Sequence, residues 1–368
     1  MAAQPAPGPA PDVGGEAGFV RLRVRAVDRL TPDAVALTFD VPDRLADAFR
    51  FRAGQHLTLR RVTDGLDVRR TYSVCSSAVR GPLRVAVKHL EGGAFSSWVT
   101  DGLRAGDELE VLPPAGRFGP AVDPGRRRRY GLIAAGSGIT PLLAVAATVL
   151  DVEPASEVAL VYGNRTSGDV MFLEELSDLK DRFPDRLQVL HVLSREEQES
   201  ELLSGRVDGP RLQRLFATLL PPHEVDEWYL CGPFGLVTDA RQALLEAGVA
   251  ATAVHVELFH ADPLPPRERT RLAGSGAAAE VTVVLHGRTT QVALERDGPA
   301  VLDAVLAVRP DAPYACKGGV CGTCRARVTA GAVEMDVNYA LEPDELASGV
   351  VLTCQSHPTT DQVRLEYL

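Results

Sequence analysis

Three cysteines are crowded into the stretch YACKGGVCGTC, residues 314–324, in a chain that contains only six cysteines. Cys316, Cys321 and Cys324 follow the spacing C-x4-C-x2-C, and Cys354 comes later in the chain. This is the plant-type spacing for a 2Fe-2S cluster that four thiolates hold. A zinc site and a set of disulfides are the two alternatives.

Neither alternative fits the spacing as well. A zinc site usually combines two C-x2-C pairs, or cysteine with histidine, and the sequence offers one such pair. Disulfides staple small secreted domains, whereas 368 residues can bury a sufficient core. Gly318, Gly319 and Gly322 would let the loop wrap closely around a cluster and turn N–H groups toward its sulfurs. We therefore predict a 2Fe-2S cluster.

Because a cluster carries one electron at a time, another site must supply electrons. In RRTYSVCSS, Arg70 and Tyr72 lie on one face of a predicted strand, where an arginine can meet a phosphate and a ring can lie against a flat cofactor. In EGGAFSSW, the residues Gly92, Gly93 and Ser96 precede or begin a predicted helix and offer a second phosphate contact. From the residues alone, the first motif is equally compatible with an edge strand that carries an ordinary salt bridge.

A second group of motifs follows predicted strands further along the chain. The stretch AAGSGITP, residues 134–141, joins an apolar strand to a helix, with Gly136 and Gly138 for close backbone approach and Pro141 in the first helical turn. Three later loops are YGNR with Arg165, LSRE with Ser194 and Arg195, and CGPFG with Cys231, Gly232 and Pro233. Functional loops of open α/β sheets gather at the carboxyl ends of the strands, so the shared placement of these loops indicates a dinucleotide site.

The charges near these loops bear on which nicotinamide nucleotide binds. Arg165, Ser194 and Arg195 could together hold a 2′-phosphate, which favours NADPH. Glu196 and Glu197 follow at once, and an acidic residue would repel that phosphate. NADH therefore remains the alternative.

The hydrophobic pattern divides the chain into segments. Residues 1–16 are rich in Ala, Pro and Gly, which is typical of a disordered tail, and residues 17–125 alternate in the manner of an antiparallel β-barrel. Residues 126–260 alternate strands with helices, which predicts a parallel α/β sheet. Residues 261–279 read as a flexible linker. Residues 280–368 begin with a predicted hairpin over 281–294 and a short helix over 299–308, before the cysteine loop.

Composition excludes several classes of protein. The formal net charge is −10, which argues against nucleic acid as a partner. No apolar run is long enough to cross a membrane, and the first residues lack the basic region and apolar core of a signal peptide. We therefore expect a cytoplasmic protein, and the sequence leaves its oligomeric state open.

With these motifs in place, the chain resembles the ferredoxin-NADP reductase superfamily from about residue 19 to its end. It has the domain order of oxygenase reductases: flavin barrel, nicotinamide domain and carboxyl-terminal ferredoxin domain. The resemblance implies FAD in the barrel, an α+β β-grasp fold for the last domain, Ser73 beside flavin N5 and Cys231 beside the nicotinamide, both in catalytic roles. The stretch HVELF stands where the family has Glu-Arg-Phe, which weakens the assignment of Glu257 to the flavin edge.

The resemblance also implies which residues bind each cofactor. The flavin residues are Arg70, Thr71, Tyr72, Ser73, Val87, Gly92, Gly93 and Ser96. The nicotinamide residues are Gly136, Gly138, Thr140, Pro141, Arg165, Ser194, Arg195, Cys231, Gly232 and Pro233. The cluster ligands are Cys316, Cys321, Cys324 and Cys354.

The same resemblance implies a reductase that passes electrons from NADPH through FAD and the cluster to a separate oxygenase. The stretches YGNRT, CKGGVCGTC and VEMDVNYALEPDEL favour a di-iron oxygenase, phenylacetyl-CoA epoxidase. A Rieske-type oxygenase such as a steroid hydroxylase is the alternative partner. A free-standing reductase of small acceptors and a non-enzymatic regulatory module are the alternative functions. A single Glu-x-x-His and a single C-x2-H motif fall short of a di-iron or Rieske site in the chain itself.

Overall fold

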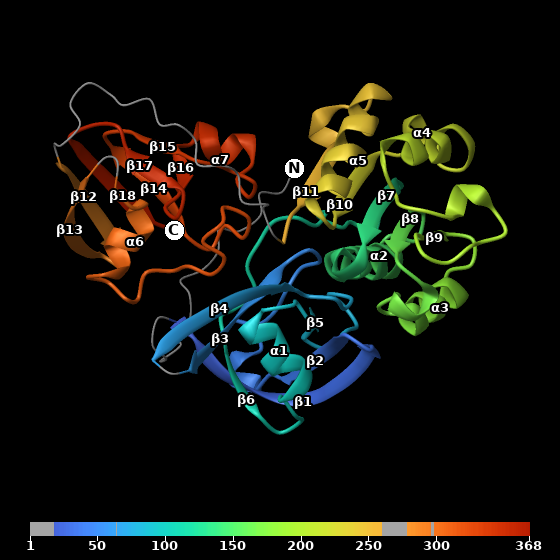
Figure 1. Ribbon diagram of the computed structural model, residues 1–368, viewed down its shortest axis with the longest axis horizontal. Coiled ribbons are helices and arrows are strands. Elements are labelled where there is room, and N and C mark those ends of the chain that lie inside the picture. The colour runs from blue at the N-terminus through green and yellow to red at the C-terminus, as the bar shows by residue number, and fades with distance from the viewer. Residues whose placement is uncertain (1–17, 64, 260–277, 296–297) are drawn as a thin grey trace.

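The computed structural model describes residues 18–63, 65–259, 278–295 and 298–368 of the chain. These residues form three parts, each with its own principal sheet, and Figure 1 shows the first part below the other two. The expected tail over residues 1–16 and residues 261–277 of the expected linker lie outside the described residues. Ala278 and Ala279, which we assigned to the linker, already belong to the first strand of the third part.

The first part is a six-stranded antiparallel barrel, as predicted. Its elements are β1 (Val20–Thr31), β2 (Ala34–Asp40), β3 (His56–Thr63), β4 (Leu66–Ser73), β5 (Arg84–Lys88), α1 (Ala94–Asp101) and β6 (Glu108–Val111). The strand order is β4-β3-β6-β1-β2-β5, and a bridge between Val74 and Val85 joins the two outer strands and closes the barrel. Alternate residues such as Leu22 and Val24 point into its core, as the period of a strand requires.

The second part is a five-stranded parallel sheet covered by helices on both faces, as the alternating pattern predicts. Its strands are β7 (Arg129–Ala135), β8 (Glu157–Asn164), β9 (Leu187–Leu193), β10 (Glu227–Cys231) and β11 (Val254–Glu257), and its helices are α2 (Ile139–Val152), α3 (Leu173–Arg182), α4 (Gly209–Thr218) and α5 (Phe234–Glu246). Helices α2 and α3 share a buried cluster with residues of the barrel, and α4 and α5 pack on the opposite face. Because both faces are covered, β7 and β8 are largely buried and largely apolar after their polar first residues.

The order of the parallel strands, β11-β10-β7-β8-β9, creates a crevice. The chain runs outward from β7 to β9 and then returns to the other side of β7 to form β10 and β11. At such a switch point, the loops after the two central strands diverge, and ligands bind at the carboxyl ends of the strands. The loops that begin at Gly136 and Gly232 lie on the two sides of this switch point.

The third part is a mixed five-stranded sheet of the order β13-β12-β18-β14-β16, with a two-stranded ribbon of β15 and β17. Its elements are β12 (Ala278–Leu285), β13 (Arg288–Glu295), α6 (Val301–Leu306), β14 (Arg325–Ala330), β15 (Val333–Met335), α7 (Pro343–Ala347), β16 (Val350–Leu352), β17 (Ser356–Pro358) and β18 (Gln362–Tyr367). The predicted hairpin is β12–β13, and its two turn residues, His286 and Gly287, both have positive φ as a tight hairpin turn requires. The predicted helix over 299–308 is the shorter α6. With β12 parallel to β18 and α6 packed beside the sheet, this is the expected β-grasp arrangement.

In the part of the chain that the structure describes, no helix has both the length and the apolar character needed to span a bilayer.

Close packing at the switch point makes Gly138 sensitive to substitution. A Cβ atom at Gly138 would lie 2.1 Å from the carbonyl oxygen of Cys231, so Gly138→Ala forces two backbone segments apart. We expect this change to lower the free energy of unfolding by about 1–3 kcal/mol. Gly235→Ala is the control, since no atom lies within 4 Å of its added Cβ in helix α5, and it should leave stability unchanged or raise it by up to about 1 kcal/mol. Equal unfolding midpoints in urea for the wild type and Gly138→Ala would contradict the close packing.

Candidate functional site

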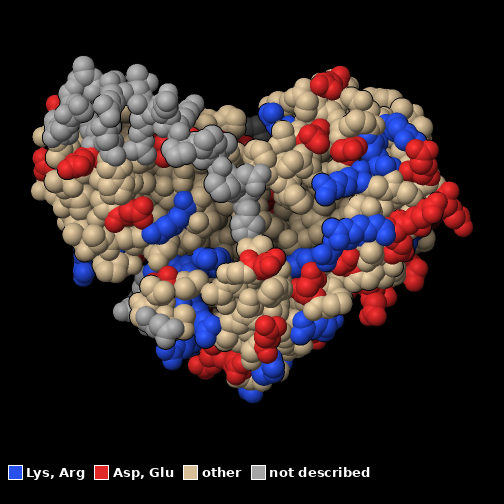
Figure 2. All heavy atoms as spheres, in the orientation of Figure 1, with Lys and Arg blue, Asp and Glu red and all other residues tan. Residues whose placement is uncertain are grey.

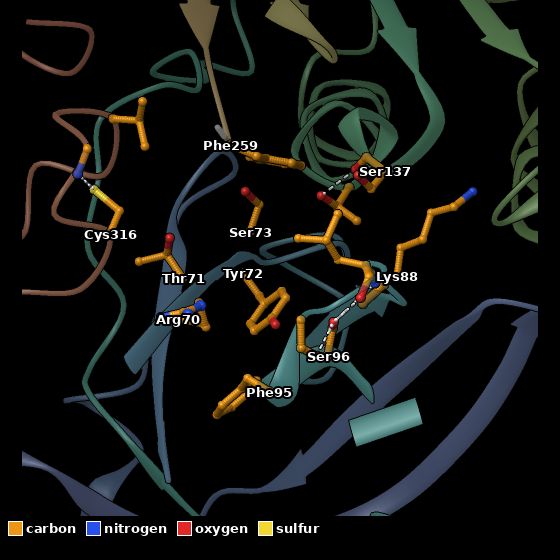
Figure 3. Close-up of a pocket in the computed structure, with 16 residues that line it drawn as sticks. Arg70, Thr71, Tyr72, Ser73, Lys88, Phe95, Ser96, Ser137, Phe259 and Cys316 are labelled. Atoms are coloured by element: carbon orange, nitrogen blue, oxygen red, sulfur yellow. Dashed lines mark hydrogen bonds between the residues drawn. The ribbon is translucent and has the colours of Figure 1, made fainter. Parts of the chain in front are cut away.

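A cavity of about 350 Å³, here called the barrel cavity, lies where the three parts meet (Figure 3). Its lining combines two strands, β4 and β5, and helix α1 of the barrel with the first turn after β7, the segment after β11 and the cysteine loop. The lining residues are Arg70, Thr71, Tyr72, Ser73, Ala86, Lys88, Leu90, Gly93, Phe95, Ser96, Ser137, Thr140, Phe259, Cys316, Gly318 and Val320. Residues that are far apart in the sequence therefore share one space.

Strand β4 presents four consecutive residues, Arg70 to Ser73, to the barrel cavity. Its hydrogen-bonded register with β3 extends over all eight residues, which fixes their directions. The Tyr72 ring stacks on Phe95 of α1, with 6.0 Å between ring centroids, and burial raises the pKa of Tyr72, so the phenol stays neutral. An arginine, a buried ring and a hydroxyl in this order suit the phosphate, the flat ring system and the polar edge of a flavin.

The start of helix α1 forms a second polar corner of the barrel cavity. Gly93 is the N-cap of α1 and supplies no side chain to cap it. A Cβ atom at Gly93 would lie 2.6 Å from Ser96 Oγ, so glycine keeps the turn tight. Ser96 Oγ accepts a hydrogen bond from the Leu90 backbone N–H at 3.1 Å. A helix start without a side-chain cap attracts anions, so this corner fits a phosphate group.

Ser73 is connected to the parallel sheet through Glu257. Ser73 Oγ donates a hydrogen bond to Glu257 Oε2 at 2.9 Å, although the two residues are 184 positions apart. Burial raises the pKa of Glu257 to about 7, and the hydrogen bond from Ser73 offsets only part of this rise. The carboxyl therefore changes charge near neutral pH, directly beside Ser73.

Cys231 lies next to Glu257 in the strand register of β10 and β11. It is fully buried, and burial, followed by the charge of Glu257, raises the pKa of its thiol. The structure thus gathers Ser73, Glu257 and Cys231 at the switch point. The proposed catalytic roles of Ser73 and Cys231 stay predictions.

A larger cavity of about 1050 Å³, the sheet cavity, opens at the carboxyl ends of the parallel strands. Its lining residues are Lys88, Ala135, Gly136, Gly163, Asn164, Arg165, Asp169, Val192, Ser194, Arg195, Gly205, Arg206, Val207, Asp208, Pro233, Gly235, Leu236 and Asp239. Figure 2 shows Lys and Arg side chains gathered on this part of the molecule, at upper right. An elongated hollow with several arginines suits an anionic dinucleotide.

The arginines of the sheet cavity differ in their surroundings. Arg165 pairs with Asp169 at 2.5 Å and with Asp33 of the barrel at 3.3 Å. Glu196, which could repel a phosphate, accepts hydrogen bonds from the backbone and side chain of Ser167 instead and does not line the cavity. Arg195 lines the cavity directly, beside Ser194.

Several predicted residues do not line either cavity: Val87, Gly92, Gly138, Pro141, Cys231 and Gly232. Val87 points into the barrel core because its neighbours Ala86 and Lys88 occupy the alternate positions that face the barrel cavity. Val87 could therefore contact a flavin only through its backbone. Gly138 serves the packing of the loop against Cys231 and not the lining of the cavity.

Sequence reasoning missed many of the residues that line the cavities, among them Lys88, Phe259 and Arg206. Lys88 lines both cavities and pairs with Asp33 at 3.4 Å. Phe259 follows β11 and places its ring at the barrel cavity, as Figure 3 shows. Arg206 lines the sheet cavity from a loop far from any quoted motif. Of these three residues, only Phe259 had a signal in the sequence, as the aromatic residue of HVELF.

The four predicted cluster ligands lie together as two interacting pairs. A hydrogen bond from Cys321 lowers the pKa of Cys316 to about 6, and a hydrogen bond from Cys324 lowers the pKa of Cys354. The thiols interact across the pairs as well, Cys321 with Cys324 and Cys316 with Cys354. Two adjacent thiol pairs are the donor set that a cluster of two iron ions requires.

Other groups around the cysteines also fit a cluster. All six cysteines of the chain are free thiols. The Gly318 backbone N–H donates to Cys316 Sγ at 3.3 Å, and Gln355 Nε2 donates to Cys354 Sγ at 3.4 Å. Gly319 and Gly322 have positive φ, which lets the loop curl around its centre. Hydrogen bonds to sulfur stabilise thiolates that bind iron.

Comparison with known proteins agrees with each part of this geometry. Residues 21–119 match the family described as oxidoreductase FAD-binding domain, and residues 132–242 match the oxidoreductase NAD-binding domain. Residues 283–359 match the 2Fe-2S iron-sulfur cluster binding domain. FAD, a nicotinamide nucleotide and a 2Fe-2S cluster are therefore the cofactors of this chain.

Two relatives and one solved structure extend over nearly the whole chain. The chain is 46% identical over 349 residues to a subunit of the 1,2-phenylacetyl-CoA epoxidase of Escherichia coli, and the match covers 95% of this chain and 98% of that protein. It is 36% identical over 356 residues to the ferredoxin reductase component of 3-ketosteroid-9-alpha-monooxygenase from Rhodococcus rhodochrous, covering 95% and 97%. The fold is similar to that of phthalate dioxygenase reductase, with a TM-score of 0.59, 23% identity and coverage of 95% and 98%.

The relatives share the three-part order that the structure shows, and their names describe subunits or components of oxygenase systems. The chain therefore belongs to the family of NAD(P)H-dependent oxidoreductases that combine FAD-binding, NAD-binding and carboxyl-terminal 2Fe-2S domains and act as reductase components of oxygenase systems.

Proposed function

We propose that this reductase takes electrons from NADPH, passes them through FAD and the 2Fe-2S cluster, and delivers them to phenylacetyl-CoA epoxidase in phenylacetate degradation. The observation that carries the electron route is the barrel cavity itself, since Ser73 of the flavin site and Cys316 of the cysteine loop both line it. A bound FAD accepts two electrons from a nicotinamide and releases them singly.

The residues around the barrel cavity have separate tasks in this route. Arg70 and the start of α1 would hold the phosphates of FAD, and Tyr72 and Phe259 would bound its ring system. Ser73 is held by Glu257, so its hydroxyl has a fixed direction at the edge of the ring. Cys316, Cys321, Cys324 and Cys354 would hold the cluster at the other side of the cavity.

The choice of partner rests on the relatives. Identity of 46% over 98% of an epoxidase component supports phenylacetyl-CoA epoxidase more strongly than 36% identity supports a steroid monooxygenase. Six free cysteines suit the reducing cytoplasm, where we place the protein.

The preference for NADPH rests on the sheet cavity. Arg195 and Arg206 line it together with Ser194, while Glu196 is bound to Ser167. Asp208, another carboxylate of the lining, caps helix α4 by accepting from the Arg211 backbone N–H at 3.0 Å. Of the charged lining residues that remain, Arg195 and Arg206 outnumber Asp239, which favours a 2′-phosphate over a free ribose hydroxyl.

An anaerobic titration of the purified protein with NADPH tests the route. We expect the flavin absorption to bleach first and a low-temperature EPR signal of one reduced 2Fe-2S cluster to follow. Cys354→Ser should abolish the EPR signal and leave flavin bleaching intact, because it removes one ligand of the cluster. A wild-type flavin that bleaches without any reduced cluster would rule out the route.

The NADPH-reduced protein also distinguishes between the two candidate oxygenase partners. Mixed with the purified di-iron epoxidase, it should be reoxidised faster than when mixed with cytochrome c or with a Rieske oxygenase. Faster reoxidation by the Rieske oxygenase would transfer the proposal to that class.

Arg195→Ala tests the nucleotide preference. A charged hydrogen bond to phosphate contributes about 1.5–3 kcal/mol, so kcat/KM for NADPH should fall by roughly 10- to 100-fold, while kcat/KM for NADH should change little. Arg214→Ala is the control, because Arg214 pairs with Glu201 and does not line the cavity. An equal loss of kcat/KM for both nucleotides, or a wild-type preference for NADH, would show that Arg195 does not recognise a 2′-phosphate.

Glu257→Gln tests the carboxyl beside Ser73. Since the pKa of Glu257 is raised to about 7, the wild-type carboxyl is neutral below that pH and charged above it. A negative charge beside the flavin opposes hydride arrival, so flavin reduction by NADPH should slow by roughly three- to tenfold between about pH 6 and about pH 8. The variant should lose this dependence in stopped-flow measurements, and Glu280→Gln, whose side chain is exposed near the start of β12, should retain it. Superimposable profiles of the wild type and Glu257→Gln would refute the assignment.

A further inference from the structure

Strand β4 carries a buried arginine that the flavin site does not use. Arg69 immediately precedes Arg70, and only 3% of it is exposed. Its Nε donates to Asp67 Oδ1 at 3.2 Å and its Nη2 donates to Asp67 Oδ2 at 2.8 Å. Asp67 also pairs with Arg60 of β3 at 3.1 Å. The guanidinium is therefore held firmly by the barrel.

The same guanidinium reaches the cysteine loop of the third part. Its carbon atom lies 4.1 Å from the centroid of the Tyr314 ring and 5.2 Å from that of Phe19. Its Nη1 donates to the backbone carbonyl of Ala312 at 3.4 Å. Tyr314 precedes Cys316 by two residues, so Arg69 contacts the loop beside a cluster ligand.

The third part has other contacts that are exposed or apolar, including Val320 against the cluster of the parallel sheet. Arg117 of the barrel pairs with Asp344 and Glu345 at 3.7 Å each, but its side chain is 55% exposed. Such exposed pairs contribute little and are screened by salt. Tyr339 meets Phe234 of α5 edge-to-face at 6.1 Å between centroids, on the side of the parallel sheet. Among the described residues, Arg69 makes the buried polar contact between the barrel and the cysteine loop.

We propose that Arg69 is a positioning residue that holds the cysteine loop against β4 and thereby sets the separation between the flavin and the cluster. Arg69 and Arg70 are neighbours on one hydrogen-bonded strand, so the contact with the loop and the contact with the flavin phosphate share a rigid frame. In Figure 3, Cys316 lies on the Thr71 side of the cavity. Electron transfer slows steeply with distance, so a loop that is released from β4 receives electrons more slowly.

This inference rests on the proposed electron route. The step that Arg69 affects moves one electron from reduced FAD to one ferric ion of the cluster, which becomes ferrous, and NADPH supplies the electron pair as a hydride. Arg69 itself exchanges no electron and no proton, because a guanidinium stays protonated. Its effect is on the fraction of molecules in which the loop is docked.

The test is anaerobic stopped-flow mixing of the FAD- and cluster-loaded protein with NADPH, following flavin and cluster separately. In Arg69→Ala we expect cluster reduction to slow by at least about tenfold, while flavin reduction stays within about twofold of the wild type. Arg69→Lys keeps the charge but loses the planar guanidinium, which binds Asp67 and stacks on Tyr314 at the same time. Its rate of cluster reduction should therefore lie between those of the wild type and Arg69→Ala. Arg61→Ala is the matched control, since Arg61 lies over Trp98 at 4.2 Å within the barrel, and both of its rates should be unchanged.

Variants of Tyr314, whose ring stacks on Arg69, give an independent arm of the experiment. Tyr314→Phe keeps the ring and should keep the wild-type rate, whereas Tyr314→Ala should slow cluster reduction as much as Arg69→Ala. The double variant should be no slower than either single variant, because both remove the same contact. If Arg69→Ala loses flavin or fails to fold, the two Tyr314 variants decide the question.

Hydrogen exchange of the oxidised protein gives a readout that does not depend on turnover. Backbone amides of residues 312–324 should exchange faster in Arg69→Ala and Tyr314→Ala than in the wild type or Arg61→Ala. Unchanged exchange together with wild-type cluster reduction in Arg69→Ala and Tyr314→Ala would overturn the inference. Failure of the wild type to reduce its cluster at all would overturn the electron route instead, so the two failures are distinguishable.

Discussion

Strand β4 supplies both the residues that line the flavin site and the contact with the cysteine loop, and its pairing with β3 holds it in place. All eight residues of the strand pair with β3, and the chain continues through Val74 into the bridge that closes the barrel against β5. A strand held in this way cannot turn its side chains freely. Arg69 is therefore directed at the cysteine loop, while Arg70 to Ser73 line the cavity beside it. The residues that line the flavin site and the residue that contacts the cysteine loop are therefore neighbours on one rigid strand.

The switch point of the parallel sheet supplies the second half of the site. Gly138 packs against the backbone of Cys231, which brings the loops after β7 and β10 together. The adjacent strand β11 ends with Glu257, whose carboxyl accepts from Ser73 of the barrel. Burial places the pKa of Glu257 near 7, so the group that orients Ser73 is also the group whose charge changes near neutral pH. The orientation of Ser73 and the charge of Glu257 are therefore linked through this one hydrogen bond.

The three parts are joined by different kinds of contact. The barrel and the parallel sheet share one buried apolar cluster, which contains Ala34 and Ala86 from the barrel and Leu142 from α2. The third part meets them through Arg69, Arg117, the pair of Tyr339 and Phe234, and Val320, which packs against the apolar cluster of the parallel sheet. Interfaces with few contacts separate more readily than those that share a core. This difference suits a reductase whose first two parts must stay aligned while its last part exchanges electrons with another protein.

Features that depend on local spacing and period could be predicted from the amino-acid sequence. Cys316, Cys321 and Cys324 are recognisable because a cluster imposes a ligand spacing, and the three folds are recognisable because strands and helices impose their own periods. The long-range partners could not be predicted in this way and became visible in the folded chain. The fold brought Glu257 to Ser73 across 184 positions, turned Val87 into the barrel core, and set Arg69 against Tyr314. The physical reason is that such contacts depend on how separate sheets pack against one another, which no local spacing or period records.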